Sequence, residues 1–235
     1  MKLSNIVSQQ EWLKARTTFL DREKAFTRAR DDLSTARRAL PWVRVEKDYV
    51  FAAPGGDKSL ADLFDGRDQL MVYHFMLGPD WKQGCKACSY LADHFDPAVI
   101  HLANRDVSFV SVSRAPLDQI EPFKKRMGWT FPWVSSFETD FNWDFHVSFE
   151  QAEVDAGETH YNYRLTRFPE TEAPGLSVFA KGDDGAIYHT YSTYARGLDI
   201  FISAYNLLDH APKGRDEDGL PYAMDWLRHH DRYGA

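Results

Sequence analysis

The sequence predicts an α/β fold with an N-terminal helical extension and an aromatic-rich insertion. Two apolar runs, over residues 70–76 and 107–113, are continuous enough to be strands buried on both faces. Segments with helical spacing follow them, over 85–103 and 116–127. A strand, helix, strand, helix order implies right-handed crossovers and parallel strands. Two β-like runs around the turn at 182–185 then predict an antiparallel hairpin.

The composition describes a globular chain with an acidic balance. Of 235 residues, 43% are hydrophobic, so the chain can bury a sizeable core. The net charge of −7 argues against non-specific nucleic-acid binding, which depends on Lys and Arg neutralising phosphates. No run approaches the ~20 apolar residues of a membrane span, and the first dozen residues lack the apolar core of a signal peptide. We expect a soluble, cytoplasmic protein without nucleic-acid or membrane partners.

The spacing of apolar residues over 9–39 predicts one long helix, which ends before Pro41. Its apolar stripe is narrow, and the rest of the helix is highly charged. Two interpretations remain open: the helix packs along its own domain, or it makes an antiparallel or swapped contact in a homodimer. The large apolar residues of the stripe recur every seven positions: Trp12, Phe19, Phe26, Leu33 and Leu40.

The next elements are short and end at glycine or proline. Gly78-Pro79 ends the first buried strand, Pro97 kinks or divides the helical segment that follows, and Gly128 ends the second helix. Ahead of that strand the chain predicts an extended stretch over 43–51, a turn at 54–56 and a helical turn over 59–64.

Residues 129–149 are unusually rich in aromatic side chains. Their irregular spacing predicts an insertion, to about residue 170, with a short helix or two and no strand ladder. Burial in the core is one interpretation, and a wall across the approach to Cys85 is the other. The eight aromatic residues are Trp129, Phe131, Trp133, Phe137, Phe141, Trp143, Phe145 and Phe149.

The C-terminal third predicts a hairpin, a helix and a tail. The hairpin strands are 176–180 and 186–191, and a helix over roughly 197–209 closes the core. From Pro212 the tail carries a charge run at 215–218, expected to be solvated, and a short amphipathic piece around 224–227. The expected organisation is a helical extension over 1–40, a domain over 41–211 and a tail over 212–235 packed on that domain.

The chain has two cysteines, Cys85 and Cys88, in a single C-x-x-C. A disulfide-stapled protein would spread its cysteines through the chain, and a bridge between near neighbours restrains the unfolded chain little. A structural role is therefore the weaker explanation. A chemical role for the two thiols is the stronger explanation of the motif.

Dithiol exchange needs one cysteine exposed at a helix N-terminus and the second one turn later. Free N–H groups and the helix dipole there stabilise a thiolate. Cys85 follows a buried strand and a proline-initiated loop, which suits the attacking thiolate, and Lys86 adds a positive charge beside it. Cys88 lies on the same side of the helix and suits the resolving thiol.

Metal binding is the rival explanation for a C-x-x-C. A structural zinc site needs four ligands, and no second cysteine pair or spaced histidine pair is present. His94 and His101 could share a helix face near the motif, but ordinary histidines are the simpler interpretation. We therefore expect neither a metal nor a cofactor, and an inert cysteine pair stays as an alternative.

Several segments across nearly the whole chain resemble the DUF899 family. They are residues 38–49, 73–81 with Cys85 and Cys88, 126–129, 131–136, 174–179 and 189–197. The resemblance implies a thioredoxin-like fold and a dithiol–disulfide oxidoreductase acting on an unspecified thiol or disulfide. The alternatives are a peroxidase-type thiol reductase, and a scaffold with the same fold and no turnover.

Three further residues are candidates for a supporting role. Thioredoxin-like folds place a cis-proline before the strand that faces the C-x-x-C, and Pro174 fits that position, with an ordinary trans proline as the alternative. Trp81 is the nearest tryptophan to the motif, whereas thioredoxins carry one immediately before the first cysteine. Arg114 follows the second strand at the sheet edge where ligands bind, although a surface salt bridge is the simpler role. The peroxidatic motif of peroxiredoxins is absent, because Lys82 stands three residues before Cys85.

Overall fold

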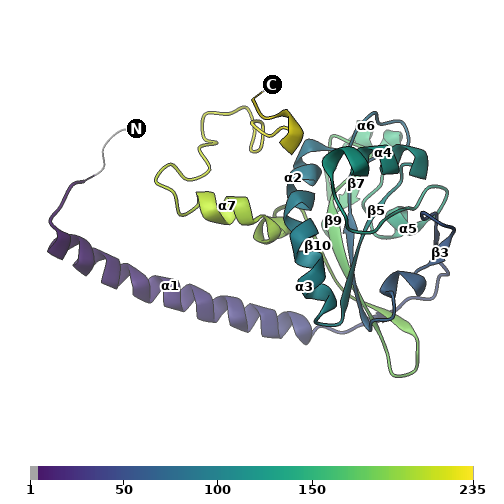
Figure 1. Cartoon of the computed structure of the whole chain (residues 1–235), viewed down its shortest axis with the longest axis horizontal. Coiled ribbons are helices and arrows are strands. Elements are labelled where there is room, and N and C mark those ends of the chain that lie inside the picture. Colours follow the sequence, from purple (N-terminus) through teal and green to yellow (C-terminus); the bar gives the residue numbers. More distant parts are fainter. Residues whose placement is uncertain (1–4, 235) are drawn as a thin grey trace. The chain divides into compact units, whose positions relative to one another are not determined.

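The computed structural model describes residues 5–234, which fall into two compact units divided after Pro41. The first contains the predicted N-terminal helix, α1 (Gln9–Arg38) (Figure 1). A capping box begins it: the Ser8 hydroxyl accepts a hydrogen bond from the Glu11 N–H at 3.3 Å, and the Glu11 carboxylate accepts one from the Ser8 N–H at 3.0 Å. α1 buries none of its residues, and Phe26 on the apolar stripe is 68% exposed.

The second unit is built on a six-stranded mixed sheet in the order β1-β10-β9-β4-β5-β6. The predicted parallel pair and the predicted hairpin are both present: β4 and β5 are parallel, and β9 and β10 are antiparallel. β9 also pairs antiparallel with β4, joining the two halves. The six strands are β1 (Val43–Arg44), β4 (Gln69–His74), β5 (Val107–Ser113), β6 (Trp133–Ser135), β9 (Gly175–Lys181) and β10 (Ile187–Tyr194).

Helices connect the parallel strands as the sequence predicts. β4 leads into α2 (Lys86–Phe95), and β5 leads into α4 (Leu117–Met127). The 3₁₀ turn η2 (Asp96–Ala98), with its proline near the start, divides α2 from α3 (Val99–Ala103), because proline cannot continue the hydrogen-bond ladder. Gly128, at a φ of 68°, ends α4 in the left-handed conformation that glycine adopts most easily.

The remaining elements are short. They are β2 (Val50–Phe51), β3 (Lys58–Ser59), η1 (Asp62–Phe64), α5 (Phe141–Asp144), α6 (Gln151–Ala156), β7 (Thr159–Tyr161), β8 (Arg164–Thr166), η3 (Ala195–Phe201), α7 (Ser203–Leu208) and η4 (His230–Arg232). The single helix expected over 197–209 is wrong in detail, because the chain becomes extended at Ile202 between η3 and α7.

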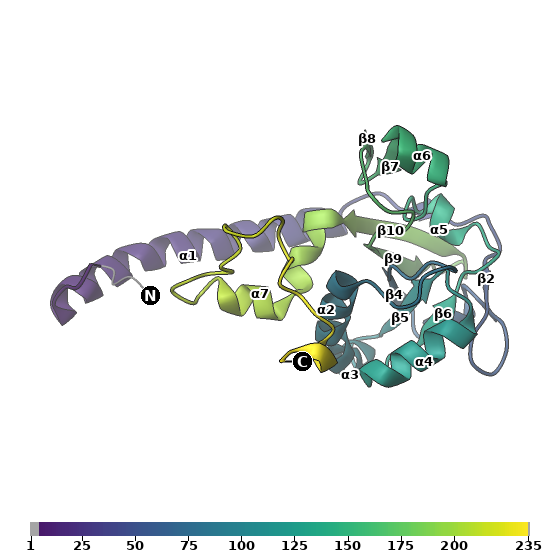
Figure 2. The ribbon, with the colours of Figure 1, turned by 90° about the horizontal axis from the view of Figure 1, so that it is seen from above.

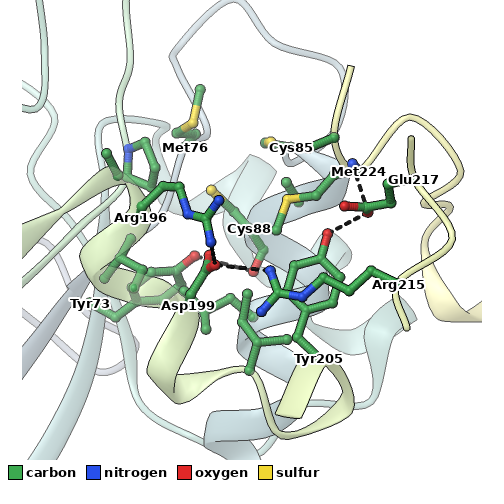
Figure 3. A pocket seen from close by; sticks show the side chains of 17 residues that line it. Tyr73, Met76, Cys85, Cys88, Arg196, Asp199, Tyr205, Arg215, Glu217 and Met224 are labelled. Carbon is green, nitrogen blue, oxygen red and sulfur yellow. Dashed lines mark hydrogen bonds and ion pairs between the residues drawn. The ribbon is translucent and has the colours of Figure 1, made fainter. Parts of the chain in front are cut away.

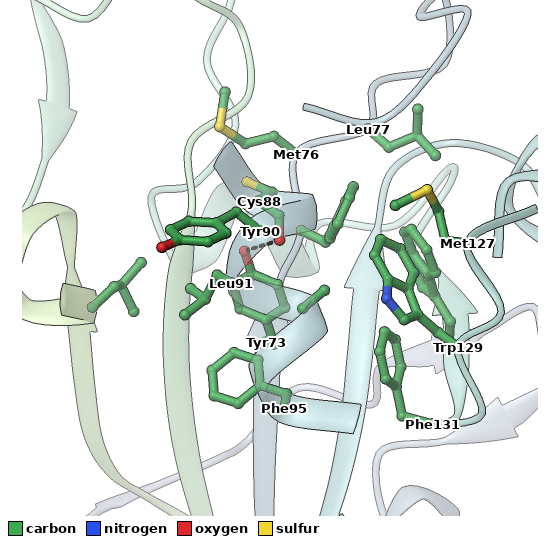
Figure 4. Close-up of a cluster of buried hydrophobic side chains, with 14 of the residues drawn as sticks. Tyr73, Met76, Leu77, Cys88, Tyr90, Leu91, Phe95, Met127, Trp129 and Phe131 are labelled. Atoms are coloured by element: carbon green, nitrogen blue, oxygen red, sulfur yellow. Dashed lines mark hydrogen bonds between the residues drawn. The ribbon is translucent and has the colours of Figure 1, made fainter. Parts of the chain in front are cut away.

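Alternating side chains of the strands build a core on each face of the sheet. Tyr73 of β4 packs under α2 and α4, whereas Val72 faces the cluster around Phe141 and Phe145. Figure 2 shows α2, α3 and α4 covering one face, with α5 and the β7–β8 hairpin over the other. Figure 4 shows the first cluster, in which Cys88 lies among apolar side chains.

The aromatic segment 129–149 belongs mainly to these cores. Six of its eight aromatic residues are buried, and Trp133 is 1% exposed with its indole N–H donating to the Ser113 hydroxyl at 3.0 Å. The expectation of an insertion without a strand is wrong for 133–135, which forms β6 parallel to β5. These three residues pair with a strand some twenty positions earlier, and local spacing carries no sign of that pairing.

The connectivity of the second unit is thioredoxin-like. A β-α-β crossover with the C-x-x-C at its first helix is followed by an antiparallel hairpin and a closing helical segment on the same sheet. This fold class agrees with the prediction. Among the described residues, no helix has the length and apolar character needed to cross a membrane.

The two interpretations of the α1 stripe predict different masses in solution. A dimer held by the stripe doubles the mass of the chain, and Phe19→Asp with Phe26→Asp returns it to the monomer, since charge at two heptad positions removes the apolar contact. Light scattering after size exclusion measures this. Asp21→Asn with Asp31→Asn is the matched control and leaves the mass unchanged. A monomeric parent protein excludes the dimer contact.

Candidate functional site

The cysteine pair lies at the start of α2, beyond the carboxyl end of β4. Cys85 is the N-cap residue, and its own N–H donates to the Met76 carbonyl at 3.1 Å. The Cys85 carbonyl accepts from both the N–H and the hydroxyl of Ser89, each at 2.9 Å. Cys85 is half-buried and Cys88 is 2% exposed, and both are free thiols. The pair is therefore held by backbone contacts on both sides of Cys85.

The residue before the pair must be glycine. A Cβ on Gly84 would lie 2.6 Å from the Phe75 ring and 2.7 Å from the Phe123 ring, closer than real contacts allow. The Gly84 carbonyl accepts from Nε2 of His229 at 2.9 Å, and Nδ1 of His229 lies 3.2 Å from the Arg126 guanidinium. Because the guanidinium can only donate, His229 carries its hydrogen on Nε2. Burial lowers the pKa of His229, which favours this neutral form.

The two thiols differ in acidity. The pKa of Cys85 is lowered to about 7, first by a hydrogen bond from the Cys88 thiol and then, against the cost of burial, by the N–H groups of Cys88 and Ala87. Burial, followed by the hydrogen bond and repulsion from Cys85, raises the pKa of Cys88 well above its ordinary value. Cys85 is therefore partly ionised at neutral pH, while Cys88 stays protonated.

Lys86 points toward the C-terminal tail. Its Nζ donates to the Asp225 carbonyl at 3.1 Å and lies 5.7 Å from the centre of the Tyr222 ring. The sequence suggested that Lys86 acidifies Cys85, but the largest cause is the Cys88 thiol. The position of Lys86 makes it an anchor of the tail beside the site.

Pro174 is near the pair, and its peptide bond is trans, as are all those of the described chain. It stands one residue before β9, lines the same pocket as both cysteines, and its carbonyl accepts from the Tyr161 hydroxyl at 2.7 Å. The structure thus places Pro174 where the thioredoxin-like arrangement predicts it, with the trans alternative rather than the cis one.

Arg114 and Trp81 lie together at a neighbouring hollow. Arg114 pairs with Glu172 at 3.2 Å, and its guanidinium lies 4.3 Å from the centre of the Trp143 ring. Since Glu172 is 2% exposed, the pair is not the surface salt bridge that was the simpler expectation. Trp81 borders this hollow from the loop after β4. Neither Arg114 nor Trp81 lines the pocket of the cysteine pair.

Glu172 is a buried carboxyl group that sequence reasoning missed. Burial raises its pKa to about 7, although Arg114 and the hydroxyl of Ser148, which donates at 2.7 Å, oppose the shift. No local pattern distinguishes this glutamate from the exposed Glu170 two residues earlier. Its burial depends on segments distant in sequence.

A pocket of about 300 Å³ opens beside both cysteines (Figure 3). Its walls come from α2, from η3 with the start of α7, and from the tail. No residue of 129–149 lines it, so the wall interpretation of the aromatic segment is wrong for this pocket. The larger apolar side chains of the walls are Tyr73, Met76, Leu91, Leu198, Ile202 and Met224.

The tail forms part of the pocket wall through groups expected to be solvated. Glu217 accepts from the Tyr205 hydroxyl at 2.7 Å, from the Trp226 indole at 2.7 Å and from the Met224 N–H at 3.0 Å. Arg215 lies 3.9 Å from the centre of the Tyr205 ring. The expected solvated run at 215–218 is therefore wrong for Arg215 and Glu217, whose partners are too distant in sequence to leave a local signal.

Comparison with protein-family models identifies the family of this chain. The family model described as "Bacterial protein of unknown function (DUF899)" matches residues 1–233. The chain belongs to the DUF899 family. No curated protein matches this family member.

Solved peroxiredoxin structures are similar to this DUF899 protein. Peroxidoxin BcpB from Mycobacterium tuberculosis has a TM-score of 0.49 at 14% identity, covering 70% of this chain and 94% of that chain. A PrxQ mutant from Xylella fastidiosa has a TM-score of 0.46 at 13% identity, covering 71% and 94%. The mitochondrial 2-Cys peroxiredoxin from Plasmodium falciparum has a TM-score of 0.43 at 14% identity, covering 70% and 95%.

We expect Cys85 to be alkylated before Cys88, with a rate that rises through pH 7 as the thiolate forms. Cys88→Ala removes the thiol that donates to Cys85 and raises the pKa of Cys85 by about one unit. Cys88→Ser is the matched variant, because its hydroxyl can still donate, and it stays closer to the parent. Iodoacetamide labelling across pH, read by peptide mass spectrometry, measures this. Labelling of Cys88 first, or one pKa for all three proteins, contradicts the assignment.

The Glu172 carboxyl predicts a pH-dependent stability. Between its ordinary pKa of 4.5 and the raised value of about 7, the folded state holds a proton that the unfolded chain has lost. Raising the pH across this window therefore favours unfolding. From pH 5 to 8 the parent loses about 2 kcal/mol of unfolding free energy relative to Glu172→Gln, which cannot ionise. Urea titrations of both proteins measure the difference.

The matched control for that measurement is Glu170→Gln, which removes an exposed carboxylate from the same loop. The difference between the parent and Glu170→Gln should stay constant over the same pH range. A constant difference for Glu172→Gln as well would show that Glu172 ionises normally in the folded protein.

Proposed function

We propose that this protein is a thiol–disulfide oxidoreductase in which Cys85 is the nucleophile and Cys88 the resolving thiol. The observation that carries the proposal is the opposite acidity of two free thiols one helical turn apart beside a pocket. A thiolate attacks disulfides, whereas a thiol does not. A pKa near the ambient pH also suits the attacking sulfur, because a more acidic thiolate is a weaker nucleophile.

In the first step, the Cys85 thiolate attacks one sulfur of a disulfide substrate. The substrate S–S bond breaks, a bond forms between Cys85 and the attacked sulfur, and the other substrate sulfur leaves as a thiolate. The N–H groups of Ala87 and Cys88 stabilise the thiolate before attack. Half-burial of Cys85 leaves one side of its sulfur open toward the pocket.

In the second step, Cys88 attacks the Cys85 sulfur and releases the second substrate sulfur. Forming the mixed disulfide removes the negative charge of Cys85, and with it the repulsion that helps to raise the pKa of Cys88. The thiol proton of Cys88 ends on one of the two released sulfurs. The protein dithiol is then oxidised to a disulfide and the substrate is reduced by two electrons. A dithiol reductant returns the protein to its starting state.

The competing function is a scaffold that keeps the fold without turnover. A scaffold needs no difference in acidity between two cysteines. It also needs no glycine before the pair, whereas Gly84 lets the backbone pass against Phe75 and Phe123 at the start of the helix. These observations favour the oxidoreductase.

Cys88→Ser should trap the substrate on Cys85, because the first step proceeds and the second cannot. Non-reducing mass spectrometry detects the mixed disulfide as an adduct that dithiothreitol removes. Cys85→Ser is the control and lowers the rate of exchange by roughly 100-fold or more, since a hydroxyl at this position has no activating base. Accumulation of the adduct on Cys88 in Cys85→Ser, or unchanged exchange in that variant, contradicts the proposal.

A further inference from the structure

We infer that the pocket beside Cys85 and Cys88 binds a small, uncharged, mostly apolar organic disulfide. This inference rests on the proposed function and names its substrate class. The inference rests on the volume of the pocket, its apolar walls, the partners of its charged side chains and the tail residues that line it.

The pocket suits a small apolar molecule. Its volume of about 300 Å³ lies at the lower end of the ~300–1,000 Å³ typical of ligand sites. Its sides are formed by Leu91 of α2, by Leu198 and Ile202 of the closing segment, and by Met224 of the tail. Methionine adapts its shape to a ligand more readily than a branched side chain does. An apolar molecule gains free energy here in proportion to the area it removes from water.

The charged side chains that line the pocket already have hydrogen-bond or ion-pair partners. Asp199 accepts from Arg196 at 2.8 Å and from Arg215 at 3.0 Å (Figure 3). Arg215 also pairs with Asp209 at 2.9 Å. Glu217 is held by its three donors from Tyr205, Trp226 and Met224. Apart from the attacking Cys85 thiolate and Glu217, which already accepts three hydrogen bonds, the pocket offers a charged substrate no unpaired opposite charge to replace its hydration, so an uncharged one is favoured.

The tail restricts the approach of a folded protein. It is tied to the residues on both sides of Cys85, through His229 to the Gly84 carbonyl at 2.9 Å and through the Asp225 carbonyl to Lys86 at 3.1 Å. Arg126 and Asp231 add an ion pair at 2.8 Å. Glu217, Ala223 and Met224 of the tail line the pocket beside Cys85, so a folded protein that reached the sulfur through the pocket would have to displace the tail. A small molecule enters the pocket without breaking these contacts.

The pocket also places the substrate for both steps. Cys85 and Cys88 both line it, so a disulfide held there lies beside the attacking and the resolving sulfur. The atoms balance as in the proposed exchange: one substrate S–S bond is broken, one protein S–S bond is formed, and two small apolar thiols leave the pocket.

The test uses three linear disulfides of equal length that differ only in their end groups. Dipropyl disulfide ends in methyl groups, bis(2-hydroxyethyl) disulfide in hydroxyls and cystamine in ammonium groups. Each oxidises the reduced protein in a single turnover, followed by the loss of free thiols. Each rate is divided by the rate of the same disulfide with dithiothreitol, which removes its intrinsic reactivity. Oxidised glutathione serves as the large, charged oxidant.

We expect the normalised rate of dipropyl disulfide to exceed that of cystamine by about tenfold or more, since one group mismatched to an apolar pocket has an effect of this size. The hydroxyl compound should fall between them and oxidised glutathione should be slowest. Met224→Glu places a carboxylate in the wall and should abolish the preference for dipropyl disulfide. Leu207→Glu, at an exposed position on α7 outside the pocket, is the matched control and keeps the preference.

Failure of the inference is distinguishable from failure of the proposed function. Equal normalised rates for the three disulfides, a faster reaction with oxidised glutathione, or a preference that survives Met224→Glu overturns the substrate class and leaves the exchange activity standing. If no disulfide oxidises the parent faster than it reacts with Cys85→Ser, the proposed function itself fails. Circular dichroism melting confirms that each variant is folded.

Discussion

The placement of Cys85 and Cys88 one turn apart at the start of α2 is the constraint on which the site depends. As a hydrogen-bond donor, the Cys88 thiol is the largest cause of the lowered pKa of Cys85, and burial of Cys85 acts against it. Cys88 is near Cys85 because α2 begins at Cys85 and presents Cys88 one turn later on the same side. Burial is the largest cause of the raised pKa of Cys88, followed by its hydrogen bond to Cys85. The deeper burial of Cys88 and the contact between the two thiols together give two identical side chains different chemistry.

The surrounding structure keeps that contact in place and limits what reaches it. Gly84 brings the backbone against two aromatic rings, and His229 of the tail holds the Gly84 carbonyl. On the inner side, the Tyr73 hydroxyl donates to the Cys88 carbonyl at 3.2 Å and fixes the first turn of α2 against the sheet (Figure 4). The tail that steadies the pair also lines the pocket. Rigidity at the cysteines and selection of a small substrate have the same structural source.

The sequence correctly predicts those parts of the molecule that the local pattern of residues determines. The strand over 70–76 is a continuous apolar run, the break at Pro97 follows from the missing N–H of proline, and the C-x-x-C carries its own spacing. The parts it missed depend on contacts between distant segments. β6 is three residues long and exists through its pairing with β5. Glu172 and Arg215 carry charge, so they suggest solvent exposure until partners such as Arg114 and Asp199 are known.

The most direct test of the account is the redox equilibrium of the cysteine pair. The protein is equilibrated with buffers of reduced and oxidised dithiothreitol, quenched with an alkylating reagent and weighed by mass spectrometry. The account predicts a reversible two-electron transition between a form with two labelled cysteines and a form with none, shifting by about 30 mV per tenfold change in the ratio of the two forms. A pair that never forms the intramolecular disulfide, or that accumulates a singly labelled species at equilibrium, would contradict it.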